Sequence, residues 1–410
     1  MPQIRPFRAV RPHRDKAHLV GSRSYLNYSE DELNDKLSGN PFTFLHIIKP
    51  EMAASMRKKV SRHDRYHLVR EGYNYYRTMN ILLKEEKESF YIYRQSSEGY
   101  TYTGLIAGIH VDEYLSGHIK KHEETIEKRE KLFEEYLEIT GFNAEPVLLT
   151  YEDRDDINSL VDLVLSSRPE FEFYTTDMVK HEMWVLSDES LEDRLVTAMA
   201  QVEDVYIADG HHRSASSALL AQIHGIDKEG PHASFMCMLL PSSQLRIRNF
   251  NRLVRDLNGL TPQEFIEAMS SEFHIEAKDD VFEPSKHGEF SIYLDNSWYA
   301  ARLKETPQSN QTVDILDSRI LTTKILQPIL GISDLRKDKR IDFIPGTEGL
   351  SRLIKEVDSG KFELGFGLFP VDFEQLKAVS DEGGIMPPKS TYIEPKLRSG
   401  LTIYELFDNS

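Results

Sequence analysis

The apolar positions along the chain fall into short runs that predict a mixture of strands and helices. Residues 42–48 are mostly apolar and are stopped by Pro50, which predicts a buried strand. Residues 90–94 and 101–110, with polar turn residues between them, predict a β-hairpin. Residues 64–83 predict a helix because large side chains recur at helical spacing, at Tyr66, Val69, Tyr73 and Tyr76.

The middle of the chain contains both predicted helices and predicted strands. Residues 121–140 predict a helix that Gly141 closes. Strands are predicted at residues 145–151 and 183–186. Residues 190–200 predict a helix capped by Ser190, with apolar side chains on one face.

A short apolar strand, residues 205–208, runs directly into Asp209-Gly210-His211-His212-Arg213. A helix rich in small residues is predicted at 214–224 and ends at Gly225. Further along, residues 291–300 predict a hairpin that turns at Asp295-Asn296, and the polar stretch 305–312 predicts a loop.

Strands and helices that do not alternate strictly indicate an α+β fold rather than a doubly wound sheet. A chain of 410 residues exceeds one average domain. We expect a first α+β unit at residues 1–245, a second at 246–385, and a C-terminal loop and strand, 386–410, that returns to the first.

Composition narrows the class of protein. Hydrophobic residues make up 40% of the chain and charged residues 29%, with neither a long apolar run nor a signal-like start, so we expect a cytoplasmic protein. The single cysteine, Cys237, lies in an apolar run and is expected to be a buried core thiol. A net charge of −17 disfavours nucleic acid and anionic membranes as partners, whereas a pocket can still hold a small anion.

The segment Asp209 to Arg213 concentrates the chemistry of an anion site. A strand that stops at a glycine before a helix leaves the positive end of that helix facing outward. Arg213 adds a planar fork suited to phosphate oxygens, and His211 and His212 add donors. Asp209 fits beside a phosphate only if it binds Mg²⁺ or accepts a proton. The alternative is that Asp209 caps the helix and the histidines meet local hydrogen-bond needs.

A second cluster spans residues 117–125. His118 and His122 are four residues apart, so a helix would place both on one face, where zinc would still lack a clear third ligand. Glu123 or Glu124 beside basic and hydroxyl groups could act as a general base, and an ordinary solvated helix start is the alternative.

A third cluster spans residues 386–396. Its prolines fix an extended course, and its side chains supply donors for an anion at Lys389, Ser390, Thr391 and Lys396. It is either a loop that reaches over an active site or an inert surface segment.

Together with other short motifs, these clusters resemble the family catalogued as domain of unknown function 1015. The motifs run in order along nearly the whole chain: Ile4-Arg-Pro-Phe-Arg-Ala9, Asn40-Pro41, Tyr93-Arg-Gln95, His122-Glu123 with Thr125, Glu145-Pro146, Asp209-Gly-His-His-Arg213 and Met386-Pro-Pro-Lys-Ser-Thr391. One departure is that Ser24-Tyr25-Leu26 replaces a Pro-Tyr-Asp stretch common in the family.

The Asp-Gly-His-His-Arg turn is also similar to the phosphate-binding turn of the ParB and sulfiredoxin superfamily, whose Asp-Gly-His-Thr-Arg form belongs to free-serine kinases. The resemblance implies a ParB/sulfiredoxin-like mixed-sheet domain in which Gly210, His211, His212 and Arg213 hold the phosphates of ADP or ATP. It further implies that Asp209 lies near Mg²⁺ and the transferred group. Sulfiredoxin needs a cysteine in this turn, which is missing here.

The function expected from these residues is a nucleotide-dependent phosphotransferase that acts on a small hydroxy compound, foremost free serine. Glu123 and Glu145, in that order, are the candidate bases, while His122, Lys389, Ser390 and Thr391 are further phosphate-binding candidates. Three alternatives stay open: a phosphoserine phosphatase, a non-catalytic nucleotide sensor and a DNA-binding ParB-like regulator. We expect a small-molecule substrate and a nucleotide as partners, and a homo-oligomer is left open.

Overall fold

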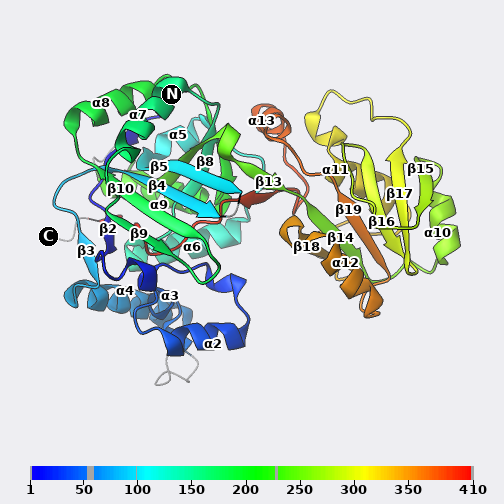
Figure 1. The fold of residues 1–410 in the computed structure, drawn as a ribbon, viewed down its shortest axis with the longest axis horizontal. Coiled ribbons are helices and arrows are strands. Elements are labelled where there is room, and N and C mark those ends of the chain that lie inside the picture. Colours follow the sequence, from blue (N-terminus) through cyan, green and yellow to red (C-terminus); the bar gives the residue numbers. More distant parts are fainter. Residues whose placement is uncertain (1, 53–59, 98, 227–229, 408–410) are drawn as a thin grey trace. The chain divides into compact units, whose positions relative to one another are not determined.

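The computed structural model describes residues 2–52, 60–97, 99–226 and 230–407. The chain forms two compact units, each drawn in Figure 1. Unit 1 comprises Met1–Lys120, Thr125–Leu245 and Pro395–Ser410, and unit 2 comprises Lys121–Glu124 and Arg246–Glu394.

A mixed sheet forms the centre of unit 1, with nine strands among the described residues (Figure 1). Its order is β6-β11-β8-β12-β5-β4-β10-β9, and β1 pairs with β5. The pairs β11–β6 and β12–β8 are parallel, whereas β11–β8 is antiparallel. This mixed sheet confirms the α+β class. The strands are β1 Ile4–Arg5, β4 Phe90–Ser97, β5 Tyr100–His110, β6 Ile119–Lys120, β8 Val147–Tyr151, β9 Phe171–Tyr174, β10 Lys180–Leu186, β11 Val205–Asp209 and β12 Ser234–Pro241.

The main core of unit 1 forms where alternate strand residues meet the helices. Leu105, Ala107 and Ile109 of β5 show the two-residue period that turns one set of side chains inward. They pack in one cluster with residues of α7 (Asp155–Leu165), α8 (Glu189–Met199) and α9 (His211–His224). Cys237 lies fully buried in the same core, as predicted, and burial raises the pKa of its thiol.

A second core in unit 1 corrects one prediction. Residues 42–48 are not a strand: Leu45–Ile48 forms helix α3, which packs with α1 (Ala17–Val20) and α4 (Arg62–Thr78). An apolar run this short cannot be assigned by periodicity alone, because a buried helical turn needs the same side chains. The predicted helix at 64–83 ends at Thr78, and Leu82–Lys84 forms strand β3 beside β2 (Val10–Pro12).

Three other predicted helix starts also differ from the structure. Helix α6 (Glu127–Thr140) begins six residues later than predicted, because Ile119–Lys120 is strand β6, paired with β11. Gly141 closes α6 at φ 74°, as predicted. Helix α8 is capped by Asp188, whose Oδ1 accepts from Leu191 N at 3.0 Å, rather than by Ser190. Helix α9 begins at His211, three residues earlier than predicted. The remaining elements of unit 1 are α2 Glu30–Gly39, α5 Val111–Leu115, β7 Phe142–Asn143 and β21 Tyr404–Glu405.

Unit 2 is built on an antiparallel sheet of six strands, counted over the described residues, in the order β15-β17-β16-β19-β14-β18. The predicted hairpin is confirmed, and Asp295 and Asn296 turn it with φ of 49° and 55°. The strands of this sheet are β14 Phe250–Val254, β15 Phe273–Lys278, β16 Glu289–Leu294, β17 Ser297–Leu303, β18 Ile341–Pro345 and β19 Leu364–Leu368. A separate antiparallel pair consists of β13 Arg246–Arg248 and β20 Tyr392–Glu394. The helices are α10 Pro262–Met269, α11 Asp317–Leu321, α12 Gly349–Asp358 and α13 Phe373–Asp381. Short turns of 3₁₀ or π helix lie at Tyr25–Asn27, Pro50–Met52, Pro231–Ala233, Ser242–Gln244, Thr312–Ile315, Thr322–Leu326 and Gly346–Glu348.

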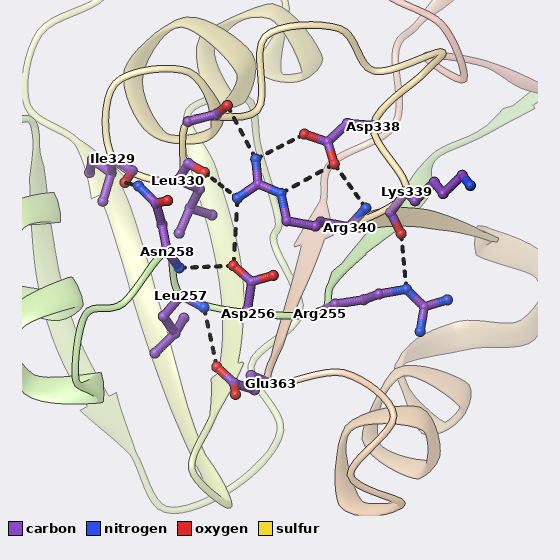
Figure 2. Close-up of polar contacts among 11 residues, drawn as sticks. Arg255, Asp256, Leu257, Asn258, Ile329, Leu330, Asp338, Lys339, Arg340 and Glu363 are labelled. Carbon is purple, nitrogen blue, oxygen red and sulfur yellow. Dashed lines mark hydrogen bonds and ion pairs between the residues drawn. The ribbon is translucent and has the colours of Figure 1, made fainter.

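Arg340 links the segment before β18 to other parts of unit 2 through hydrogen bonds and ion pairs. Figure 2 shows the guanidinium of Arg340 at the centre of a polar network. It donates to the carbonyl oxygens of Leu330 at 2.9 Å and Gly331 at 3.2 Å, and it pairs with Asp338 at 2.9 Å and Asp256 at 3.5 Å. The hydrogen bonds that Arg340 donates to the Asp338 carboxylate raise the pKa of Arg340 and lower the pKa of Asp338.

Candidate functional site

The turn between β11 and α9 places the candidate site at the end of a buried strand. Pairing between β11 and β8 shifts register between Ile207 and Asp209, where the chain leaves the sheet. Gly210 then adopts φ 108°, and its carbonyl oxygen accepts from the backbone N–H of Arg213 at 2.9 Å and of Ser214 at 3.0 Å. Because glycine has no side chain, Gly210 itself cannot cap the positive end of α9.

Gly210 also makes room for the side chain of Arg213. A Cβ atom at Gly210 would lie 2.9 Å from both Nε and Nη2 of Arg213, closer than real Cβ contacts. The guanidinium therefore folds back over the turn only because residue 210 is glycine. The positive φ points to glycine independently.

Two carboxylates flank this guanidinium. Arg213 Nη1 pairs with Glu145 Oε1, and Arg213 Nη2 lies 3.5 Å from Asp209 Oδ2. Burial acts to lower the pKa of Arg213, but the charges of Glu145 and Asp209 outweigh burial and raise that pKa above its usual value. Arg213 is thus held charged and in place between two acidic groups.

The C-terminal segment completes the cluster within unit 1. Lys396 Nζ lies 3.5 Å from Asp209 Oδ2, and Ser399 Oγ donates to Glu145 Oε2 at 3.1 Å. The sequence identified Lys396 as an anion donor but gave no reason to select Ser399, because only the fold brings residue 399 to residue 145. Two cations and two carboxylates therefore meet at the turn, and the charge of the cluster sums to zero.

The two histidines of the turn differ in environment. His211 is buried at 6% exposure, whereas His212 is half-buried with its ring 6.5 Å from that of Phe133 on α6. Both belong to the first turn of α9, so their backbone lies at the positive helix end. That the two imidazoles contact phosphate stays a prediction.

The other predicted site residues belong to unit 2. The backbone carbonyl of His122 accepts from Met386 N at 2.8 Å, which joins the second and third sequence clusters, and Glu123 is the next residue. Residues 118–122 lie in and around strand β6, so His118 and His122 do not share a helix face. Among the described residues, no group of three or more histidine, cysteine or acidic side chains could hold a metal ion by itself.

The third cluster is largely occupied with contacts inside unit 2. Lys389 adopts φ 60°, and its carbonyl oxygen accepts from Arg252 Nη2 at 3.0 Å. Ser390 Oγ lies 2.8 Å from Ser318 Oγ, and Thr391 is buried. The ammonium of Lys389 lies 5.1 Å from the centre of the Phe250 ring. That Lys389, Ser390 and Thr391 contact phosphate stays a prediction.

A buried histidine, His181, contacts the C-terminal segment. Arg398 Nε donates to His181 Nε2 at 3.1 Å, and the hydroxyl of Tyr93 lies 2.6 Å from His181 Nδ1. Burial, followed by the charge of Arg398, lowers the pKa of His181 to about 3. Arg398 also pairs with Asp177 at 3.1 Å. These bonds anchor the segment that carries Lys396 and Ser399. Nothing in the sequence pattern indicated them.

Over the described part of the chain, none of the helices combines the length and apolar character needed to cross a bilayer. A comparison with curated proteins found no match.

Solved structures with a related arrangement were found at low similarity. A free serine kinase in complex with AMP is 15% identical, with a TM-score of 0.37, and the match covers 74% of this chain and 93% of that one. A conserved hypothetical protein from Pyrococcus furiosus is 14% identical, with a TM-score of 0.34 and coverage of 70% and 90%. C-terminally truncated SbnI from Staphylococcus aureus is 11% identical, with a TM-score of 0.38 and coverage of 70% and 82%.

A family model gives a direct result. The model described as "Protein of unknown function (DUF1015)" matches residues 4–319. The match covers more than half of the chain and includes Glu145 and the whole β11–α9 turn. The chain therefore belongs to the DUF1015 family, as its motifs had predicted.

Proposed function

We propose that this protein is a nucleotide-dependent phosphotransferase that uses ADP or ATP and acts on a small hydroxy compound, with free serine as the first candidate. One observation carries the proposal: a helix with glycine at its N-cap follows a buried strand, with Arg213 held over the turn between Glu145 and Asp209. Helix N-termini with an adjacent arginine are suited to phosphate oxygens. The similarity of this turn to that of free-serine kinases selects serine as the first acceptor to test.

The balance of charge bears on the cofactor. Arg213 and Lys396 are offset by Asp209 and Glu145, so a nucleotide would bring its negative charge to a cluster that is neutral overall. Mg²⁺ is commonly held by one or two carboxylates together with substrate phosphates, and the carboxylates present fit that pattern. Asp209, whose side chain is 41% exposed, would be the main protein ligand. Bound there, Mg²⁺ would neutralise phosphate charge.

The residues of the turn would then have distinct roles in phosphoryl transfer. Arg213 and the first turn of α9 would hold the transferred phosphoryl group and stabilise its charge as its bond to the nucleotide breaks. A carboxylate would orient the acceptor hydroxyl and take its proton as the new phosphorus–oxygen bond forms. We assign this base to Glu145, because it shares Arg213 with Asp209 in unit 1.

The test is an assay of the full chain with serine, Mg²⁺ and either ADP or ATP, in which O-phosphoserine is detected by mass spectrometry. Asp209→Asn and Arg213→Ala should each lower turnover by at least about a hundredfold, because each removes a charge used in the transition state. Arg154→Ala is the matched control, since Arg154 forms an exposed ion pair with Asp156 away from the turn.

Unchanged turnover in both site variants would remove the turn from the mechanism. Glu145→Gln and Glu123→Gln, compared in the same assay, decide which carboxylate is the base. Phosphate release from O-phosphoserine without any nucleotide would select a phosphatase instead, and tight nucleotide binding without turnover would select a sensor.

A further inference from the structure

A cavity of about 280 Å³ lies in unit 1, and none of the residues of the β11–α9 turn lines it. Its walls come from four parts of the chain that are distant in sequence: the start of the chain around β1, residues 84–88, residues 230–231, and β21. We call it the Arg5 pocket, after a lining that includes Arg5, Arg8, Lys84, Glu88, Tyr404 and Glu405. Small-molecule sites span roughly 300–1,000 Å³, so this pocket suits a small metabolite.

The pocket holds one arginine in a fixed position. Arg5 Nη2 donates to the carbonyl oxygens of Gly230 and Pro231, each at 3.2 Å, and to the hydroxyl of Tyr404 at 2.5 Å. Tyr404 in turn donates to Pro231 O at 2.8 Å. The three bonds that Arg5 donates all use one nitrogen of its guanidinium, Nη2. A group held in this way has already lost its rotational freedom, which lowers the entropic cost of binding an anion.

The second arginine is less constrained. Arg8 Nε donates to Glu85 O at 3.1 Å, and within the described part of the chain its two Nη groups have no hydrogen-bond or ion-pair partner. Arg8 is exposed, so its fork lies at the rim of the pocket and is accessible from solvent. Two guanidinium groups on one pocket form the donor set that carboxylate and phosphate oxygens prefer.

The charge of the lining favours an anion. Glu405 is matched by Lys84 at 2.6 Å and by Arg77 at 3.0 Å, so its charge is already offset inside the protein. The lining as a whole has three cations against the carboxylates of Glu405 and Glu88. A net positive pocket in a chain of net charge −17 is a local reversal of the overall field.

One part of the lining is apolar. The ring of Phe7 lies 4.9 Å from that of Tyr404, and both residues are buried. We infer that the Arg5 pocket binds a small organic anion, whose carboxylate or phosphate oxygens contact Arg5 and Arg8 and whose short carbon body lies against Phe7. This inference rests on the pocket alone and stands independently of the proposed function.

The experiment is calorimetric titration of the full chain with succinate, with inorganic phosphate, and with succinamide as the neutral isostere of succinate. Arg8→Gln should weaken binding of at least one anion by about tenfold or more, the effect of one charge-assisted hydrogen bond. Glu88→Gln removes an opposing carboxylate and should tighten that binding by roughly threefold. The matched control is Arg14→Gln, since Arg14 is exposed and outside the lining.

The two sites of the protein can be told apart in the same titrations. Phosphate binding that Arg8→Gln weakens belongs to the pocket, whereas binding that only Arg213→Ala weakens belongs to the β11–α9 turn. Comparison of the two anions shows whether a carboxylate or a phosphate is preferred. If Arg8→Gln and Arg14→Gln have equal effects on both anions, or if succinamide binds as tightly as succinate, the inference is wrong.

Discussion

Replacement of Gly210 by alanine probes the geometry of the proposed phosphate site most selectively. The backbone at φ 108° is one that L-residues rarely adopt, so the substitution should cost about 1–3 kcal/mol of stability by itself. The added Cβ would in addition lie 2.9 Å from Nε and Nη2 of Arg213. Because these atoms are at the end of a flexible side chain, the substitution should displace the guanidinium and leave the turn folded.

The displaced guanidinium should affect binding more than stability. Loss of one charge-assisted hydrogen bond to a phosphate corresponds to roughly 1.5–3 kcal/mol, so we expect affinity for ADP to fall about ten- to a hundredfold. Gly117→Ala is the matched control: φ is 86°, and a Cβ atom at residue 117 would meet no other group within 4 Å. It should lose comparable stability yet bind ADP like the wild type.

Urea unfolding can be followed for unit 1 separately. The chain has two tryptophans, Trp184 in unit 1 and Trp298 in unit 2, so a Trp298→Phe background leaves fluorescence from Trp184 alone. Calorimetry then gives the affinity for ADP in the same background. Equal affinities for Gly210→Ala and Gly117→Ala would refute the idea that Arg213 must lie over the turn to bind phosphate.

Three further outcomes are expected. Lys396→Met should weaken ADP binding by about threefold to tenfold, because it removes a cation 3.5 Å from Asp209. The control Lys377→Met breaks an exposed ion pair with Asp381 and should leave the affinity for ADP, measured by titration calorimetry, unchanged. The folded pKa of His181, about 3, lies below its unfolded value of about 6.5, so between these values only the unfolded chain binds the proton and stability falls as pH falls. Urea titrations from about pH 7 to 5 should show this loss of unfolding free energy, at most about 1.4 kcal/mol per pH unit. If the unfolding free energy of His181→Gln depends on pH as steeply as that of the wild type, His181 is not its cause. Arg340→Ala should destabilise unit 2 by about 1–2 kcal/mol, measured through Trp298 in a Trp184→Phe background, without changing ADP affinity.

Local patterns predicted the parts of the fold that local forces determine. The hairpin at residues 291–300 followed from alternation and from two residues that tolerate positive φ. The strand before Asp209 followed from a short apolar run that precedes a glycine. The start of α6 did not follow, because residues 119–120 join the sheet through β11, which lies about 85 residues further along the chain. The strand predicted at residues 42–48 was wrong for a related reason, since burial and not periodicity decides the secondary structure of so short a run.

In the candidate site too, the sequence predicted some residues, and only the fold brings the others into place. Asp209, Gly210 and Arg213 could be selected because their residue types are unusual between a strand and a helix. Glu145 was one of two candidate bases, and only the fold brings it to Arg213. Ser399 and the bonds of Arg398 had no sequence signal, because they depend on the return of the C-terminal segment to unit 1.

The most direct test of the central claim is a crystal structure of the full chain with ADP and Mg²⁺. The proposed function predicts phosphate oxygens within hydrogen-bond distance of the backbone N–H groups that open α9 and of the Arg213 guanidinium. Nucleotide bound elsewhere, with Arg213 still paired only to Glu145 and Asp209, would contradict it.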